Sequence, residues 1–128
     1  MPRILIADDS RVQIHIFSTY LTAKGFTVAV AVDALQAWMS ALREVPDAIV
    51  LDLNMPSGSG IDVLKKLRTS IKTQRIPVVV VTGTSDAELE RMARELGAAE
   101  FLHKPVEPAQ LYTILVRLLA MGEASTAP

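Results

Sequence analysis

The chain has 128 residues, the length of one domain with a single hydrophobic core. Hydrophobic residues make up 50% and charged residues 21%, which excludes an intrinsically disordered chain. The absence of cysteine excludes disulfides, thiolate metal sites and thiol catalysis, and with two histidines we expect any bound metal to be held by oxygen. The net charge is −1, and the basic residues cluster no further than Lys65, Lys66 and Arg68, so we expect no direct binding to nucleic acid.

Apolar runs in this sequence are too short for a membrane span. None is longer than Val28 to Val32, whereas a helix needs roughly 20 apolar residues to cross a bilayer. The N-terminal residues also lack the apolar core of a secretion signal. We therefore expect a cytoplasmic protein with no membrane partner.

Short apolar runs alternate with longer segments of helical period, which is typical of a parallel sheet covered by helices. The expected elements, in chain order, are a strand at 4–7, a helix at 10–24, a strand at 26–32, a helix at 34–44, a strand at 48–51, a helix at 60–70, a strand at 78–81, a helix at 85–96, a strand at 99–102 and a helix at 108–122.

Local signals mark the helix ends. Ser85 and Glu88 have the spacing of a capping box, so we expect Ser85 to cap the fourth helix. The fifth helix should begin near Pro108 and end at Gly122, because glycine is favoured just past a helix end. We therefore expect one domain over residues 1–121 and a short flexible tail over 122–128.

Polar side chains appear where the expected strands end: Asp8-Asp9 after the first, Asp52 after the third, Thr82 after the fourth and Lys104 after the fifth. Parallel strands open on one edge of the sheet, where doubly wound folds bind ligands. Three carboxylates in one cleft repel one another, and either raised proton affinities or a divalent cation can relieve this repulsion. Mg²⁺ is the better candidate, because it suits oxygen ligands and leaves room for a phosphate. Lys104 and Thr82 could hold phosphoryl oxygens, so we expect a site where one carboxylate attacks phosphorus and forms an acyl phosphate.

The same motifs carry a resemblance to a known family. From residue 3 to about 120 the chain resembles the receiver domain of two-component response regulators, the CheY-like domain. The segments that carry the resemblance are 4–10, 52–56 with Gly60, 82–83 and 101–105. The resemblance implies the α/β fold class, as a three-layer α/β/α doubly wound sandwich of the flavodoxin-like type with five parallel strands in order 2-1-3-4-5.

The resemblance also implies roles for individual residues. Asp52 would be the phosphoacceptor. Asp9, Asp52 and the backbone carbonyl of Asn54 would hold Mg²⁺, and Asp8 would act mainly through water. Lys104 and Thr82 would bind the phosphoryl oxygens.

A switch is a further implication of the family pattern. Thr82 would move toward the phosphate while Phe101 turns inward, which alters the face made by the fourth helix, the fifth strand and the fifth helix. Phe101 has no hydroxyl, so we expect this switch to depend on packing alone. The family's lysine–proline bond is commonly cis, which raises the expectation of a cis bond between Lys104 and Pro105.

The expected fifth helix is more apolar than its own core requires. Between Leu111 and Met121 the apolar arc spans about 260°, against the roughly 100° that faces a core. We hypothesise that Tyr112, Val116 and Leu119 form a partner or dimer surface. The alternative is a set of scattered exposed apolar side chains, which are common on proteins.

Each motif has a plainer interpretation when taken singly. Asp8-Asp9 suits a solvated helix start, and the segment 52–56 suits an ordinary turn. Their ordered combination favours the acceptor site. We expect no chemical role for His103, and we expect Trp38 and Met39 to pack in the core or at its edge.

The expected function is that of a single-domain response regulator. A histidine kinase or histidine phosphotransfer protein would phosphorylate Asp52 in a Mg²⁺-dependent reaction, and phosphorylation would change binding to a downstream protein. The chain would be no enzyme beyond self-phosphorylation and self-dephosphorylation. Nothing foldable follows Gly122, so output would come through binding. The alternatives are an intermediate carrier in a phosphorelay and a receiver cut from a larger regulator.

Two other functional classes fit less well. A dehalogenase-like phosphatase resembles a pattern with Asp-x-Asp at the first strand, which Asp8-Asp9-Ser10 does not supply. A flavin-binding electron carrier needs a cradle of glycines or hydroxyls after that strand, and the sequence has none there.

Overall fold

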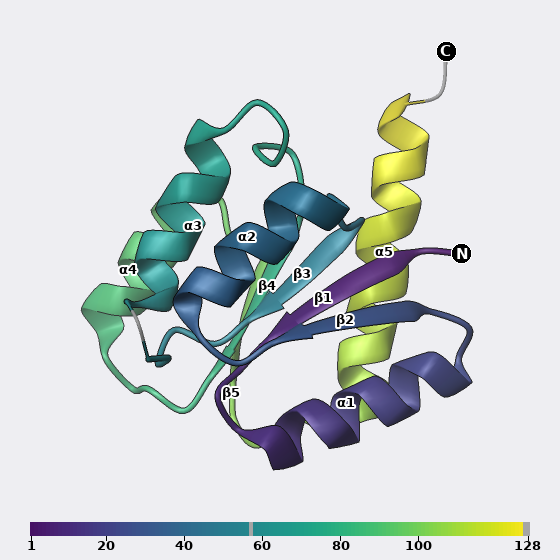
Figure 1. The fold of residues 1–128 in the computed structure, drawn as a ribbon, viewed down its shortest axis with the longest axis horizontal. Coiled ribbons are helices and arrows are strands. Elements are labelled where there is room, and N and C mark those ends of the chain that lie inside the picture. The colour runs from purple at the N-terminus through teal and green to yellow at the C-terminus, as the bar shows by residue number, and fades with distance from the viewer. Residues whose placement is uncertain (57, 127–128) are drawn as a thin grey trace.

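The computed structural model describes residues 1–56 and 58–126, with side chains as far as Gly122. Strands and helices alternate along the chain (Figure 1). The elements are β1 Arg3–Ala7, α1 Arg11–Ala23, β2 Thr27–Ala31, α2 Ala34–Glu44, β3 Ala48–Leu51, α3 Gly60–Thr69, β4 Val78–Thr82, α4 Ala87–Glu95, β5 Glu100–His103 and α5 Pro108–Thr126. Each expected element is present, with ends that differ by a few residues.

The sheet has the strand order β2-β1-β3-β4-β5, and every pairing is parallel. Both the fold class and the strand order expected from the sequence are confirmed. The register matters for the site, because Ala7 pairs with Leu51 and Leu51 pairs with Val80. The last residues of β1, β3 and β4 therefore end near one another at the same edge of the sheet.

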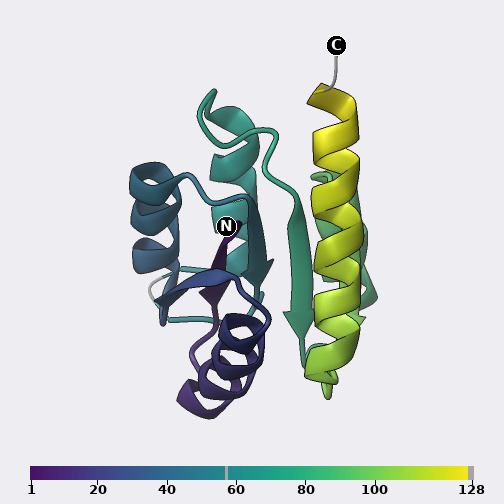
Figure 2. The ribbon, with the colours of Figure 1, turned by 90° about the vertical axis from the view of Figure 1, so that its right-hand side faces the viewer.

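Helices cover both faces of the sheet. Helices α1 and α5 lie on one face and α2, α3 and α4 on the other (Figures 1 and 2). Two apolar clusters correspond to these two layers, one including Leu64 and Leu67 of α3, the other including Phe17 of α1 and Leu115 of α5. Strand β4 is buried along its whole length, which explains its unbroken run of valines.

Two expected helix ends were wrong. The cap of α4 is Asp86, whose side chain accepts a hydrogen bond from the Glu88 N–H, and not Ser85. Aspartate is at least as good a cap as serine, so a one-residue shift costs nothing. Helix α5 does not end at Gly122 but continues to Thr126. An interior glycine costs only about 1 kcal/mol, and nothing near it breaks the helix.

The tail expected over 122–128 therefore overlaps the helix, and residues 127 and 128 lie outside the described part of the chain. Among the described residues, no helix combines the length and apolar character needed to cross a bilayer.

Candidate functional site

Asp8 and Asp52 are held side by side by the sheet. Asp8 follows Ala7 at the end of β1, and Asp52 follows Leu51 at the end of β3. Ala7 and Leu51 are paired across these neighbouring strands. The ladder continues one step beyond the strands, because the Asp52 N–H donates to the Ala7 carbonyl at 2.9 Å. Both aspartates are buried, which sequence patterning alone did not indicate for charged residues.

Lys104 reaches both of these carboxylates from the segment that follows β5. Its N–H donates to the Thr82 carbonyl at 2.9 Å, which anchors the residue beside the end of β4. Its Nζ lies 2.9 Å from Asp8 Oδ2 and 2.9 Å from Asp52 Oδ2. The bond to Pro105 is cis, as the family pattern favours. The structure thus brings together Asp8, Asp52 and Lys104 as predicted.

The remaining carboxylate oxygens are oriented by backbone amides. Asp8 Oδ1 accepts from the Ser10 N–H at 2.9 Å, and Asp52 Oδ1 accepts from the Asn54 N–H at 3.1 Å. In each aspartate one oxygen is tied to its own loop and the other faces Lys104. Sequence reasoning did not identify the Ser10 N–H, because a backbone donor leaves no side-chain signal.

Burial in the cleft disfavours the negative charge of the Asp8 carboxylate and is only partly offset by the positive charge of Lys104. Burial raises the pKa of Asp8, and the hydrogen bonds from Ser10 and Lys104 offset this only in part. Burial lowers the pKa of Lys104, but its hydrogen bonds to Asp8 and Asp52 raise that pKa by more, so the ammonium is stabilised. One ammonium thus faces three neighbouring carboxylates when Asp9 is included.

The carboxylates also form an oxygen-only donor set. Asp8, Asp9 and Asp52 each offer an oxygen within 4.8 Å of the others, and Asp9 is exposed to solvent. Mg²⁺ prefers such hard oxygen ligands and retains several waters, for which the exposed side of Asp9 leaves space. The residues present therefore fit a magnesium ion.

Thr82 and Phe101, the expected switch residues, are both buried. Thr82 Oγ1 accepts from the Thr84 N–H at 3.4 Å. The ring of Phe101 packs edge-on against His103 at 5.3 Å between centroids, and the Arg94 guanidinium lies 6.0 Å from that ring. His103 itself is exposed and lies 3.5 Å from Glu90, on the side of α4.

Gly60 packs directly against the backbone of Asp52, where there is no space for a side chain. The sequence motif alone did not reveal this steric role. A Cβ atom there would lie 2.4 Å from the Asp52 carbonyl oxygen and 2.5 Å from the Leu53 Cα. The Gly60 N–H also donates to the Leu53 carbonyl at 3.0 Å. Helix α3 can begin directly against the Asp52 backbone only because residue 60 has no side chain.

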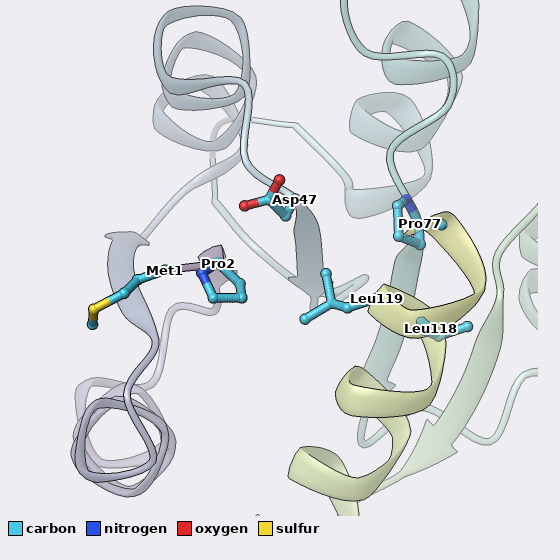
Figure 3. Close-up of a pocket in the computed structure, with 7 residues that line it drawn as sticks. Met1, Pro2, Asp47, Pro77, Leu118 and Leu119 are labelled. Atoms are coloured by element: carbon cyan, nitrogen blue, oxygen red, sulfur yellow. The ribbon is translucent and has the colours of Figure 1, made fainter. Parts of the chain in front are cut away.

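The apolar stripe expected on α5 is divided between several environments. The Tyr112 ring packs against Tyr20 and Phe26, at 6.2 and 5.8 Å between centroids. Leu119 lines a cavity of about 420 Å³ with Pro2 and Asp47 (Figure 3). Pro2 and Asp47 precede β1 and β3, so this cavity lies at the opposite end of these strands from Asp8 and Asp52. Val116 is 42% exposed.

Comparison with known proteins decides the family. Residues 4–116 match the model of the response regulator receiver domain. The chain belongs to this family. It is a receiver domain of two-component response regulators, which interact with histidine kinases and with downstream targets.

Individual relatives show how far the similarity extends. The chain is 36% identical to the response regulator PleD of Caulobacter vibrioides over 86% of its own length and 24% of PleD. It is 37% identical to the transcriptional regulatory protein PrrA of Mycobacterium tuberculosis over 98% of its length and 53% of PrrA. The chain thus spans between a quarter and about half of these relatives.

A solved receiver domain bears on the metal. The receiver domain of the sensor histidine kinase PA1611 of Pseudomonas aeruginosa superimposes with a TM-score of 0.85 at 27% identity, over 93% of this chain and 98% of that one. Its structure has a magnesium ion coordinated in the active site cleft. Receiver domains bind Mg²⁺ in such an acidic cleft.

Proposed function

We propose that this receiver domain accepts a phosphoryl group on Asp52 and signals through the resulting change at its surface. The observation that supports this most directly is the position of Lys104, whose ammonium contacts Asp52 and Asp8 at 2.9 Å each. A partly buried cation beside a buried carboxylate at the end of a central strand suits transfer of a phosphoryl group, which carries negative charge.

Asp52 is better placed than Asp8 to act as the nucleophile, because of its position in the sheet. Strand β3 lies between β1 and β4, so Asp52 has the acidic loop on one side and Thr82 and Lys104 on the other.

In the proposed reaction, an oxygen of the Asp52 carboxylate forms a bond to phosphorus. The bond between phosphorus and a histidine nitrogen of the donor breaks, and that nitrogen leaves with its electron pair. Lys104 and the Thr82 hydroxyl would bind the phosphoryl oxygens. Asp9, Asp52 and the Asn54 carbonyl would hold Mg²⁺, with Asp8 acting mainly through water, and the ion would offset repulsion between the carboxylate and the incoming phosphoryl group.

The output would arise from a change of charge in a tightly packed cleft. Phosphorylation adds about −1.5 to −2 charges beside Lys104 and Thr82. We expect Thr82 to move toward the phosphoryl group and Phe101 to turn inward. In this structure Phe101 is already buried, and the Arg94 guanidinium of α4 lies 6.0 Å from its ring. The face formed by α4, β5 and α5 would then bind a downstream partner. The stripe of Tyr112, Val116 and Leu119 on α5, in which Val116 is 42% exposed, would bind a partner or a second copy.

Two roles remain within this proposal. The chain could act alone as a response regulator, or it could carry phosphate onward to a histidine phosphotransfer protein. Fast and reversible transfer between two purified histidine proteins would favour the carrier. An acyl phosphate that only hydrolyses would favour the regulator.

The test is the intact mass of the protein after incubation with acetyl phosphate and Mg²⁺. We expect one phosphoryl adduct in the wild type and in Asp62→Asn, which removes an exposed carboxylate outside the cleft. Asp52→Asn should give no adduct. An adduct of equal yield in Asp52→Asn would place the acceptor elsewhere and refute the proposal.

A further inference from the structure

Helix α2 turns its small side chains toward the sheet, and two of its large ones, Leu35 and Met39, toward solvent. Its buried residues are three alanines and a serine: Ala34, Ala37, Ser40 and Ala41. Leu35 and Met39 are instead 58% and 53% exposed, and Trp38 and Leu42 are half-buried. Met39 therefore does not pack in the core or at its edge, contrary to the interpretation from sequence.

The outward apolar residues of α2 follow the spacing of a helix–helix seam. Leu35, Trp38, Met39 and Leu42 occupy positions i, i+3, i+4 and i+7, which lie on one stripe of a helix. The buried alanines already supply the core-facing side of α2. We call these four residues the α2 stripe. Trp38 packs in part against the core, whereas Leu35 and Met39 are exposed, and core packing does not account for these two side chains.

Hollows flank the α2 stripe on both sides. One, of about 370 Å³, lies toward α3 and is lined by Trp38, Val63 and Lys66 among others. The other, of about 360 Å³, lies toward β2 and is lined by Val30 and Met39 among others. Leu35 borders both. A ridge of apolar side chains between two grooves is the surface that a second helix packs against.

The charges around the α2 stripe are mainly positive. On the α3 side lie Lys65 and Lys66, and the Lys66 ammonium is 6.0 Å from the centre of the Trp38 ring. On the β2 side lies Arg43, whose side chain is 70% exposed. Arg43 is paired with Glu44, which also contacts Arg3. Glu44 lies nine residues after Leu35, which places it on the opposite face of the helix from that residue.

Two other acids lie near the stripe: Asp62 borders the same hollow as Lys65 and Lys66, and Asp33 caps the start of α2. The three cations Lys65, Lys66 and Arg43 still outnumber these carboxylates. A second copy of this chain would bring the same cations against one another. A helix with an apolar stripe and acidic flanks would instead complement them.

We propose that the α2 stripe is the docking surface for an amphipathic helix of another protein, with acidic residues on both sides of its apolar face. This surface is on α2 and is separate from the α4, β5 and α5 face. Binding there does not depend on whether Asp52 is the phosphoacceptor.

The chain offers a direct probe, because Trp38 is its only tryptophan. The experiment titrates the protein with a synthetic helical peptide that has leucines at i, i+3, i+4 and i+7, glutamates on both flanks and no tryptophan. We expect a saturable change in Trp38 fluorescence. The same peptide with lysines in place of the glutamates should bind about tenfold more weakly or not at all.

Variants of the protein locate the binding. Met39→Glu should weaken binding of the glutamate peptide by about tenfold. Val12→Glu, which changes a 71% exposed side chain on α1, should leave it unchanged. Circular dichroism verifies folding, and Leu35→Gln provides a second variant of the stripe.

Three results would overturn the proposal. The first is no binding of the glutamate peptide or equal binding of both peptides. The second is binding that Met39→Glu and Leu35→Gln leave intact. The third is a dimer of the unphosphorylated protein in sedimentation that Met39→Glu dissociates, which would assign the stripe to a second copy.

Discussion

The ammonium of Lys104 lies 2.9 Å from Asp52 Oδ2, although 52 positions separate the two residues along the chain. The same Nζ lies 2.9 Å from Asp8 Oδ2. This single cation compensates two buried carboxylates. The excess of negative over positive charge determines how the stability of the domain responds to mutation, pH and metal.

Loss of that cation should destabilise the protein. Lys104→Met leaves Asp8 and Asp52 buried without a charged partner, and we expect the free energy of unfolding at pH 7 without metal to fall by about 2 kcal/mol. Urea unfolding measures this. Lys72→Met, at an exposed position, should change it little. The double variant with Asp8→Asn should be more stable than the sum of the two single effects predicts, and strict additivity of the two substitutions would contradict the pairing.

The raised pKa of Asp8 predicts a pH dependence. The folded protein binds the Asp8 proton more tightly than the unfolded chain does. The contribution of this proton to the free energy of unfolding is therefore complete below pH 3.8 and is lost as the pH rises through the pKa of Asp8 in the folded protein. Asp8→Asn resembles the protonated form. In EDTA it should therefore be more stable than the wild type at pH 7 and nearly equal to it at pH 3.

Urea unfolding across this pH range tests the Asp8 prediction. In saturating Mg²⁺ the order at pH 7 should reverse, because a ligand stabilises the state that binds it and the variant has lost one carboxylate of the donor set. Asp62→Asn should reproduce neither behaviour. A variant less stable than the wild type in EDTA at pH 7 would show that the Asp8 carboxylate is favourable when buried.

Gly60→Ala should disturb the Asp52 backbone. The added Cβ would lie 2.4 Å from the Asp52 carbonyl oxygen, so the helix or the loop must shift, and we expect a loss of about 1–3 kcal/mol. Formation of the phosphoryl adduct should slow as well. Gly83→Ala is the matched control for stability, because a methyl group added there would have nothing within 4 Å. Equal stability of the two variants in urea would contradict the close approach.

Arg68 should hold the end of α4 against the body of the domain. Its guanidinium donates to the carbonyls of Leu96, Gly97, Gln74 and Ile76, and burial lowers its pKa. Arg68→Met removes these donors, and we expect a loss of about 2 kcal/mol. Hydrogen exchange should quicken at the C-terminal end of α4. Arg75→Met, at an exposed position, should leave exchange there unchanged.

The partner surface on α5 predicts an effect of Val116→Glu on assembly. If this surface forms a dimer, the solution mass of the phosphorylated wild type should double while the phosphorylated variant stays a monomer. Sedimentation measures both. The substitution should leave stability within about 0.5 kcal/mol, because the side chain is exposed. A wild type that is monomeric before and after phosphorylation would remove the dimer.

Helix periods, β-branched runs and polar residues at strand ends are local signals, and they were sufficient to predict the elements, the parallel sheet and the meeting of Asp8, Asp52 and Lys104. The cap at Asp86 in place of Ser85 could not be predicted. Serine and aspartate cap helices with nearly equal free energy, so the packing of the first turn decides which of the two neighbours is the cap.

The sequence by itself determined which residues meet at the edge of the sheet, because strand order and crossover hand leave few other arrangements. Only the tertiary structure decided which apolar side chains are covered. Tyr112 is partly covered by Tyr20 and Phe26, whereas Met39 is exposed although its helix packs on the sheet. The physical reason is that hydrophobic periodicity shows which side chains share one face of a single helix. Whether that face is buried depends on which neighbouring helices and strands cover it.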